Sequence, residues 1–329
     1  MMRAVLAVLL ALPALLTAQE KLVWPTESDA FARGAHFSEF IQPTASGNPS
    51  SGLFGDVRNG GYRFHEGIDI KPVRRDRRGE ALDDVYCAMG GVVRYVNFIG
   101  GNSGYGRYVV VTHPQMDVEV YTLYAHLAEI DESVRPGIQV AAGKRLGRMG
   151  RSASYGISKD RSHLHFEIGL RISDSFDLWY KAKKYKERNF AGNYNGMNLT
   201  GFDPLAFFSD AKAGRLDGGF AKYISDMPTA LVARVYTKKI PDFTRLHPAL
   251  CDLDGKTGAW DLHMTWFGLV KKVERAKSLS PNSREGTVEI IKVAPSQLNH
   301  KCRKMIIKTK GGSYKPNEAF KDFIRALFT

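Results

Sequence analysis

Short alternating runs of apolar and polar residues dominate the chain between about residues 52 and 208. Four of these runs are rich in β-branched and aromatic residues, which predicts strands over 84–88, 91–96, 108–112 and 118–123. The glycine-rich stretch 100–106 lies between two of them and lacks the Lys-Ser/Thr pair of a phosphate-binding loop, so we interpret it as a hairpin loop. Strands of this length and spacing predict a mainly β, antiparallel domain over residues 52–210.

The pattern changes after about residue 211. Further strands are expected at 231–236, 260–273, 287–293 and 304–308, and 317–328 carries an apolar stripe typical of an amphipathic helix. We therefore predict a second, small α+β domain over residues 211–329, to which the sequence assigns no role. Residues 171–200 are basic and aromatic and look like an insertion. They end shortly before Asp203-Pro204-Leu205, which is expected to mark a stop.

The first eighteen residues have the layout of a secretory signal peptide. A short positive start (Met1-Met2-Arg3) precedes apolar residues 4–16 and the small residues Thr17 and Ala18. The apolar run is shorter than the roughly 20 residues that a spanning helix needs. We expect a signal peptide over 1–18, an N-terminal segment over 19–51, no transmembrane segment, and a secreted or periplasmic protein.

Net charge and cysteine content exclude few classes of binding partner. The formal net charge of +13 favours anionic partners, whether nucleic acid, membrane surface or wall polymer, but the basic residues are scattered as on solvated faces. A signal peptide argues against nucleic acid. Three cysteines are too few for a disulfide scaffold or a cysteine zinc site. An oxidising compartment permits one bridge, preferably Cys251–Cys302, and Cys87 is expected to be a small buried residue.

Two motifs place polar side chains suited to metal binding on extended segments. In His163-Leu164-His165-Phe166-Glu167-Ile168, strand alternation puts the two histidines on one face and the apolar residues on the other. In His65-Glu66-Gly67-Ile68-Asp69-Ile70, the same alternation pairs His65 with Asp69. Imidazole and carboxylate groups are suitable zinc ligands. Each motif alone is weak, and a structural pair of strand histidines is the alternative. The helical zinc motif H-E-x-x-H does not apply, because position 69 is Asp.

A third element, Tyr124-Ala125-His126-Leu127, favours the metal site over a structural pair of strand histidines. In order, the chain shows F-G, R, H-x-G-I-D-I, Y-G-x-x-V-V-V-x-H, Y-A-H-L, G-x-x-x-G and H-L-H-F-E-I. Over roughly residues 52 to 208 this series closely resembles the lysostaphin-type, LytM-like zinc endopeptidases that degrade peptidoglycan.

The resemblance implies an antiparallel β peptidase domain of the duplicated hybrid motif type. It implies one zinc ion per chain bound by His65, Asp69 and His165, with His126 and His163 as catalytic residues that do not bind the metal. The expected activity is hydrolysis of peptide bonds in peptidoglycan cross-links or stem peptides. A catalytically inactive relative that binds the wall or activates another hydrolase is the alternative. Two departures from the family pattern, the RRDRRGEALDD stretch between Pro72 and Val85 and the 171–200 insertion, are expected to reshape the groove.

Other candidate residues are given lesser roles. His113 is expected to be structural, and His36, His247, His263 and His300 to be ordinary surface or core histidines. Glu66 and Glu167 are either partners of the metal ligands or solvated carboxylates, and the solvated state is favoured. Tyr105 and Tyr155 lie in loops that could flank a groove.

Overall fold

The computed structural model describes residues 22–58, 63–114, 116–280, 283–298 and 305–329. The predicted signal peptide, His300 and Cys302 lie outside these ranges, so the Cys251–Cys302 bridge stays a prediction. Among the described residues, no helix has the length and apolar character needed to cross a membrane.

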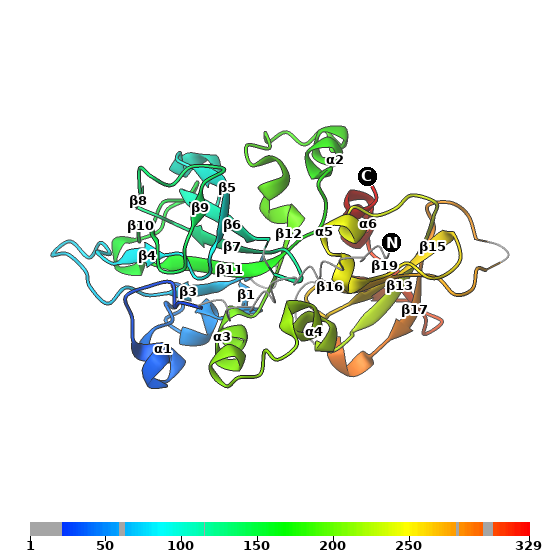
Figure 1. Cartoon of the computed structure of the whole chain (residues 1–329), viewed down its shortest axis with the longest axis horizontal. Coiled ribbons are helices and arrows are strands. Elements are labelled where there is room, and N and C mark those ends of the chain that lie inside the picture. The colour runs from blue at the N-terminus through cyan, green and yellow to red at the C-terminus, as the bar shows by residue number, and fades with distance from the viewer. Residues whose placement is uncertain (1–21, 59–62, 115, 281–282, 299–304) are drawn as a thin grey trace, which may run out of the picture.

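A seven-stranded antiparallel sheet forms the centre of the N-terminal half (Figure 1). The strand order is β12-β11-β7-β6-β5-β9, and β3 pairs with β11 on the side opposite β7, beyond the end of β12. These strands are β3 (Ile68–Ile70), β5 (Gly91–Asn97), β6 (Tyr108–His113), β7 (Val120–Ala125), β9 (Gln139–Val140), β11 (Leu164–Arg171) and β12 (Leu199–Phe202). The predicted antiparallel β fold and the hairpin loop between β5 and β6 are confirmed.

Smaller sheets complete this half. One contains β4 (Asp84–Tyr86), β10 (Arg145–Arg148) and β8 (Glu129–Ile130), and the other contains β1 (Val57–Arg58) and β2 (Arg63–Phe64). Along β11, Leu164, Phe166 and Ile168 are fully buried in the apolar core, as their alternation predicted.

The N-terminal segment packs on the same core. Its short helix α1 (Ala30–Arg33) lies beside Trp24, whose ring stacks on Phe31 at 4.6 Å between centroids. Trp24 also meets Phe208 edge-on. Phe208 belongs to α3 (Pro204–Lys212), whose first turn is capped by the Asp203 side chain. The Asp203-Pro204-Leu205 motif was expected to end the preceding structure. A helix begins there, because the Asp203 side chain accepts hydrogen bonds from the backbone N–H groups of Leu205 and Ala206.

The 171–200 insertion lies between the two halves of the molecule (Figure 1). Its helix α2 (Phe176–Lys183) buries Trp179 and Tyr180. Lys183 at the end of that helix pairs with Asp322 of the C-terminal helix at 2.9 Å. The insertion is therefore an ordered part of the fold that contacts both halves.

The C-terminal half has a five-stranded sheet in the order β14-β16-β15-β13-β17. Its elements are α4 (Gly219–Asp226), β13 (Leu231–Thr237), α5 (Phe243–Leu246), β14 (Cys251–Asp252), β15 (Gly258–Met264), β16 (Val270–Arg275), β17 (Val288–Val293), the β18–β19 hairpin (Ile306–Lys308 and Tyr314–Pro316) and α6 (Glu318–Leu327). The amphipathic helix is confirmed as α6. The single strand expected over 260–273 is wrong: a tight turn at Gly268 (φ 93°) divides it into β15 and β16.

Candidate metal centre and groove

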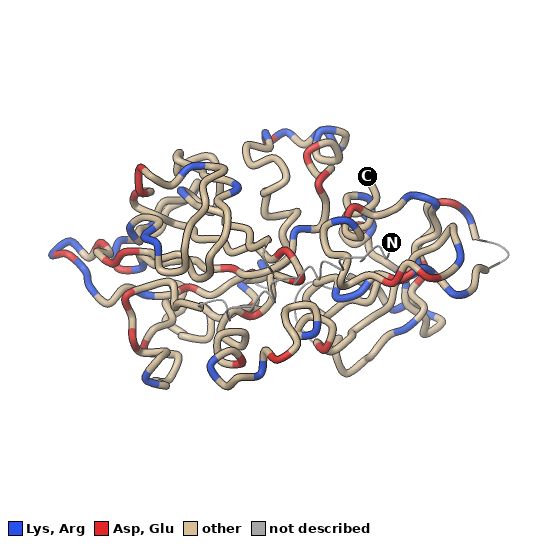
Figure 2. The backbone as a smooth tube through the Cα atoms, in the orientation of Figure 1, with Lys and Arg blue, Asp and Glu red and all other residues tan. Residues whose placement is uncertain are grey.

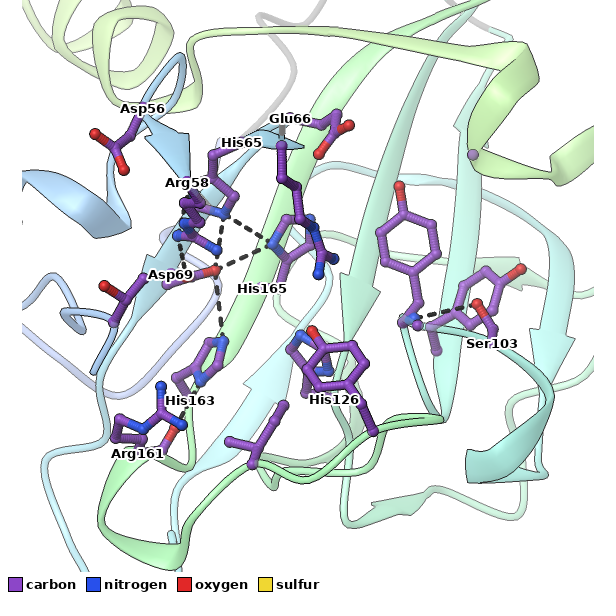
Figure 3. A pocket seen from close by; sticks show the side chains of 18 of the residues that line it. Asp56, Arg58, His65, Glu66, Asp69, Ser103, His126, Arg161, His163 and His165 are labelled. Carbon is purple, nitrogen blue, oxygen red and sulfur yellow. Dashed lines mark hydrogen bonds and ion pairs between the residues drawn. The ribbon is translucent and has the colours of Figure 1, made fainter. Parts of the chain in front are cut away.

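The three predicted ligands meet at one point of the central sheet (Figure 3). Asp69 of β3 and His165 of β11 are directly opposite each other in the antiparallel register, and His65 lies just before β3. His65 Nε2 is 3.0 Å from Asp69 Oδ1 and 3.1 Å from His165 Nδ1, and His165 Nδ1 is 3.1 Å from Asp69 Oδ1. All three side chains are buried.

This triangle fits a tetrahedral divalent cation. Zinc–nitrogen and zinc–oxygen bonds of about 2.0–2.1 Å place tetrahedral ligand atoms about 3.3 Å apart. The three edges of 3.0 to 3.1 Å are close to that value, and two imidazoles with one carboxylate are donors that zinc accepts. Three protein ligands leave a fourth position open for water or substrate. The residues present therefore fit a zinc ion.

Glu167 orients His165 from behind. The His165 Nε2–H donates to Glu167 Oε1 at 2.9 Å, which leaves Nδ1 facing the other two ligands. Glu167 also accepts from the hydroxyls of Tyr105 (2.7 Å) and Tyr121 (2.8 Å) and is 1% exposed. The expectation of a solvated carboxylate is therefore wrong for Glu167. The alternation of β11 contained the signal, since positions 165 and 167 share one face of the strand.

Arg58 holds Asp69 in an equivalent way. Its Nη2 donates to Asp69 Oδ2 at 2.7 Å, and its Nε donates to the Ser51 carbonyl at 3.0 Å. One carboxylate oxygen of Asp69 is thus occupied by the guanidinium, and the other faces the two imidazoles. His65 is oriented by its Nδ1–H, which donates to the Leu53 carbonyl at 2.8 Å. The residue pattern assigns no role to Arg58, because only the folding of the 51–58 loop over the strand brings it to Asp69.

His126 and His163 lie beside the triangle (Figure 3). Their ring centroids are 4.9 Å apart, and each Nδ1–H donates to a backbone carbonyl: His126 to Ser152 at 2.8 Å and His163 to Arg161 at 2.6 Å. These bonds favour the tautomer whose Nε2 carries a lone pair. The Nε2 of His163 lies 3.5 Å from Asp69 Oδ1. His126 has a φ of 61°, which is uncommon for a residue other than glycine and indicates backbone strain at the site.

Burial and neighbouring charge set the protonation of the site. Burial lowers the pKa of His126 well below its usual value, and His163 and His165 lower it further. Burial alone would raise the pKa of Asp69, but His65 and His163 hold it well below the usual range. For His165, burial opposes protonation, yet hydrogen bonds to Asp69 and Glu167 raise its pKa to about 9. At neutral pH His126 is therefore neutral and Asp69 ionised, while His165 carries a proton that a cation would displace.

A groove of about 1140 Å³ opens over these residues. One wall comes from the N-terminal segment at residues 43–48, and another comes from the insertion at residues 188–197. Tyr105 and Tyr155 line it, as expected from their loops. Of the two departures from the family pattern, the 171–200 insertion thus contributes to the groove, while the stretch between Pro72 and Val85 contributes none of the described lining residues.

The remaining histidines in the described ranges lie away from the groove. His113 is buried between the Gly90 carbonyl and the Thr122 hydroxyl, which agrees with a structural role. His247 is also fully buried and donates to the Arg171 carbonyl. His263 pairs with Glu274 on the C-terminal sheet, 3.0 Å away.

Residues 63–176 match the model of peptidase family M23. This part of the chain is an M23 peptidase domain, in agreement with the predicted family. No curated protein matches the chain.

Three solved structures are similar to parts of it. A protein assigned as a glycyl-glycine endopeptidase, LytM, from Ruminococcus gnavus is 31% identical over 32% of this chain and 40% of its own (TM-score 0.26). A zinc-containing peptidase from Vibrio cholerae is 25% identical over 36% of this chain and 32% of its own (TM-score 0.27). The catalytic domain of the antimicrobial peptidase lysostaphin from Staphylococcus simulans is 16% identical over 53% of this chain and 95% of its own (TM-score 0.32). The chain thus spans less than half of the first two proteins, and the family assignment rests on the family model.

Proposed function

We propose that the chain is a secreted zinc endopeptidase that hydrolyses peptide bonds of peptidoglycan. The observation that carries the proposal is the buried triangle of His65, Asp69 and His165 with edges near 3 Å, because its donors and spacing suit a zinc ion that keeps one open position. The M23 domain supports peptide hydrolysis as the reaction.

A zinc ion held there would polarise a water molecule and the scissile carbonyl. The chain's own residues supply the remaining chemistry. His126 and His163 can accept a proton at Nε2, because their Nδ1–H groups are held by backbone carbonyls. One of them can take the proton of the attacking water at Nε2, and the Nε2–H formed in this way can donate a hydrogen bond to the oxygen that becomes negative. A proton held at Nε2 can then pass to the leaving amine.

The groove suits an extended substrate. It is open along walls from separate segments, and it places backbone and side-chain polar groups on both sides of the histidines. Figure 2 shows lysine and arginine spread over both halves of the molecule, which is compatible with an anionic wall polymer and gives no reason to propose nucleic acid as the partner.

The test combines metal content with product analysis. We expect one zinc ion per chain, lysis in a peptidoglycan zymogram, and cleaved peptide cross-links or stem peptides by mass spectrometry. His165→Ala should lose zinc and activity. His126→Ala should keep zinc and lose turnover. His263→Ala, in a histidine far from the groove, is the matched control and should change neither. Full zinc loading without cleavage would favour a catalytically inactive wall-binding relative, and activity in both site variants would refute the site.

Secretion is a separate part of the proposal. It rests on residues 1–18 of the sequence, which have the layout of a signal peptide. Sequencing the N-terminus of protein recovered from outside the cytoplasm should find the chain beginning after the small residues near Ala18. Recovery of a chain that still begins at Met1 would contradict it.

A further inference from the structure

Three exposed or half-buried arginines line the groove: Arg63, Arg161 and Arg188. None of them has an ion pair within 4 Å in the described part of the chain. The fourth arginine of the groove, Arg58, is different, because it is bonded to Asp69. The three guanidinium groups are thus charged donors in the lining of the groove.

Two of these guanidinium groups lie over aromatic rings. The Arg63 guanidinium lies 5.5 Å from the centroid of the Tyr155 ring, and the Arg188 guanidinium lies 5.2 Å from that of Phe190. The cation–π attraction holds such a guanidinium over the ring, and its several N–H groups give it donors beyond those used within the protein. Such a planar fork binds a carboxylate through two parallel hydrogen bonds.

Arg161 lies next to the proposed catalytic histidine. Its carbonyl accepts from His163 Nδ1–H at 2.6 Å, and its Nε donates to the Ser158 hydroxyl at 3.0 Å. Figure 3 shows Arg161 directly beside His163 at the edge of the site. A substrate group bound to this side chain would lie close to the scissile bond.

The charge balance of the groove points the same way. Four arginines line it against three carboxylates, Asp56, Glu66 and Asp69. Asp69 is already bonded to Arg58, so it does not neutralise the other three arginines. A bound divalent cation would add two further positive charges. A neutral peptide would leave this excess uncompensated, whereas carboxylates on the substrate would balance it.

We propose that the groove selects peptides that carry free carboxylates close to the scissile bond, and that Arg63, Arg161 and Arg188 recognise those carboxylates. The inference rests on the proposed peptidase function, but it specifies the substrate more narrowly. A neutral glycyl-glycine peptide would be a poor substrate, and amidation of the substrate carboxylates would weaken binding.

The experiment compares peptidoglycan peptides with free carboxylates and the same peptides with those groups converted to primary amides. The zinc-loaded protein should cleave the acid form with a kcat/KM at least about tenfold higher, the effect of losing one charge-assisted pair. The acid-to-amide ratio is the kcat/KM for the acid form divided by that for the amide form. In Arg63→Gln, Arg161→Gln and Arg188→Gln, this ratio should fall by about tenfold where the arginine contacts a carboxylate. Arg135→Gln, in an exposed arginine outside the groove lining, is the control and should keep the ratio.

Binding to His126→Ala, measured with the same two peptides, separates this inference from the proposed function. Tighter binding of the acid form, weakened by added salt, supports carboxylate recognition even if the zinc-loaded protein proves unable to hydrolyse peptides. Equal binding and equal cleavage of the acid and amide forms would overturn the inference while leaving peptidase activity intact. So would an acid-to-amide ratio that none of the three substitutions changes.

Discussion

Replacing Glu167 by Gln should weaken zinc binding without unfolding the protein. The substitution keeps the size of the side chain and removes its charge. The amide oxygen can still accept from His165 and Tyr105, and the amide NH₂ can donate to the Tyr121 hydroxyl, which now lies 2.8 Å from Glu167 Oε2. The packing around position 167 is therefore retained while the electrostatic support of His165 is lost.

The magnitude follows from the bond between His165 and Glu167. A hydrogen bond to a charged group contributes about 1.5–3 kcal/mol, against about 0.5–1.5 kcal/mol for a neutral one. Burial would raise the pKa of Glu167, but His165 and the two tyrosines lower it, so the carboxylate is ionised at neutral pH. Loss of such a partner of a metal ligand typically costs 10–100-fold in metal affinity, or about 1.4–2.7 kcal/mol.

The assay is a competition titration of the metal-free protein with zinc and a chelator of known affinity at pH 7. Circular dichroism and thermal melting of the same samples establish that the variant is folded. Tyr121→Phe is the matched control: it removes one donor to Glu167 and leaves the charge, so its effect on the zinc Kd should be several-fold smaller. A folded Glu167→Gln protein with an unchanged zinc Kd would refute the reasoning that Glu167 supports His165 as a ligand.

Three further expectations concern other parts of the fold. Arg58→Gln should weaken zinc binding by roughly tenfold, since it removes the charged donor to the buried Asp69; an unchanged Kd in the same titration would contradict that role. Burial lowers the pKa of His113 and of His247 to about 4, so the unfolded chain takes up protons first as pH falls below about 6.5. The free energy of unfolding should therefore drop by about 2 kcal/mol per histidine between pH 6.5 and 5, and a flat urea-denaturation profile would exclude this. Gly106→Ala should lower the melting temperature, because φ is 67° and an added Cβ would lie 1.9 Å from a backbone oxygen; an unchanged melting temperature would show that the loop readjusts.

The sequence predicted the parts of the molecule that depend on local alternation. The strands over 84–125 and the burial of Leu164, Phe166 and Ile168 follow from residues two apart sharing a face. The meeting of the two histidine motifs was expected only from the resemblance to the LytM-like endopeptidases. The amphipathic helix α6 was likewise visible as a stripe of period 3.6.

What the sequence did not predict depends on tertiary contacts. Arg58 reaches Asp69 only because a loop folds back, and the insertion forms a groove wall only because α2 packs between the two halves. The division of 260–273 into two strands depends on a single turn at Gly268, which lies in the mostly apolar stretch 264–270, where periodicity does not mark the turn. Glu167 was misjudged because a carboxylate is usually exposed. Donors from the distant Tyr105 and Tyr121 and from the neighbouring His165 reverse that preference.

The pairing of β3 with β11 has a consequence for when the metal can be acquired. His65 and Asp69 are close in sequence, but His165 follows them by about a hundred residues and reaches them only when the two strands are in register. A chain synthesised only as far as β10 offers at most two of the three donors. Firm zinc capture therefore requires the complete, folded sheet, so metal loading should follow the pairing of β11 with β3 rather than accompany synthesis.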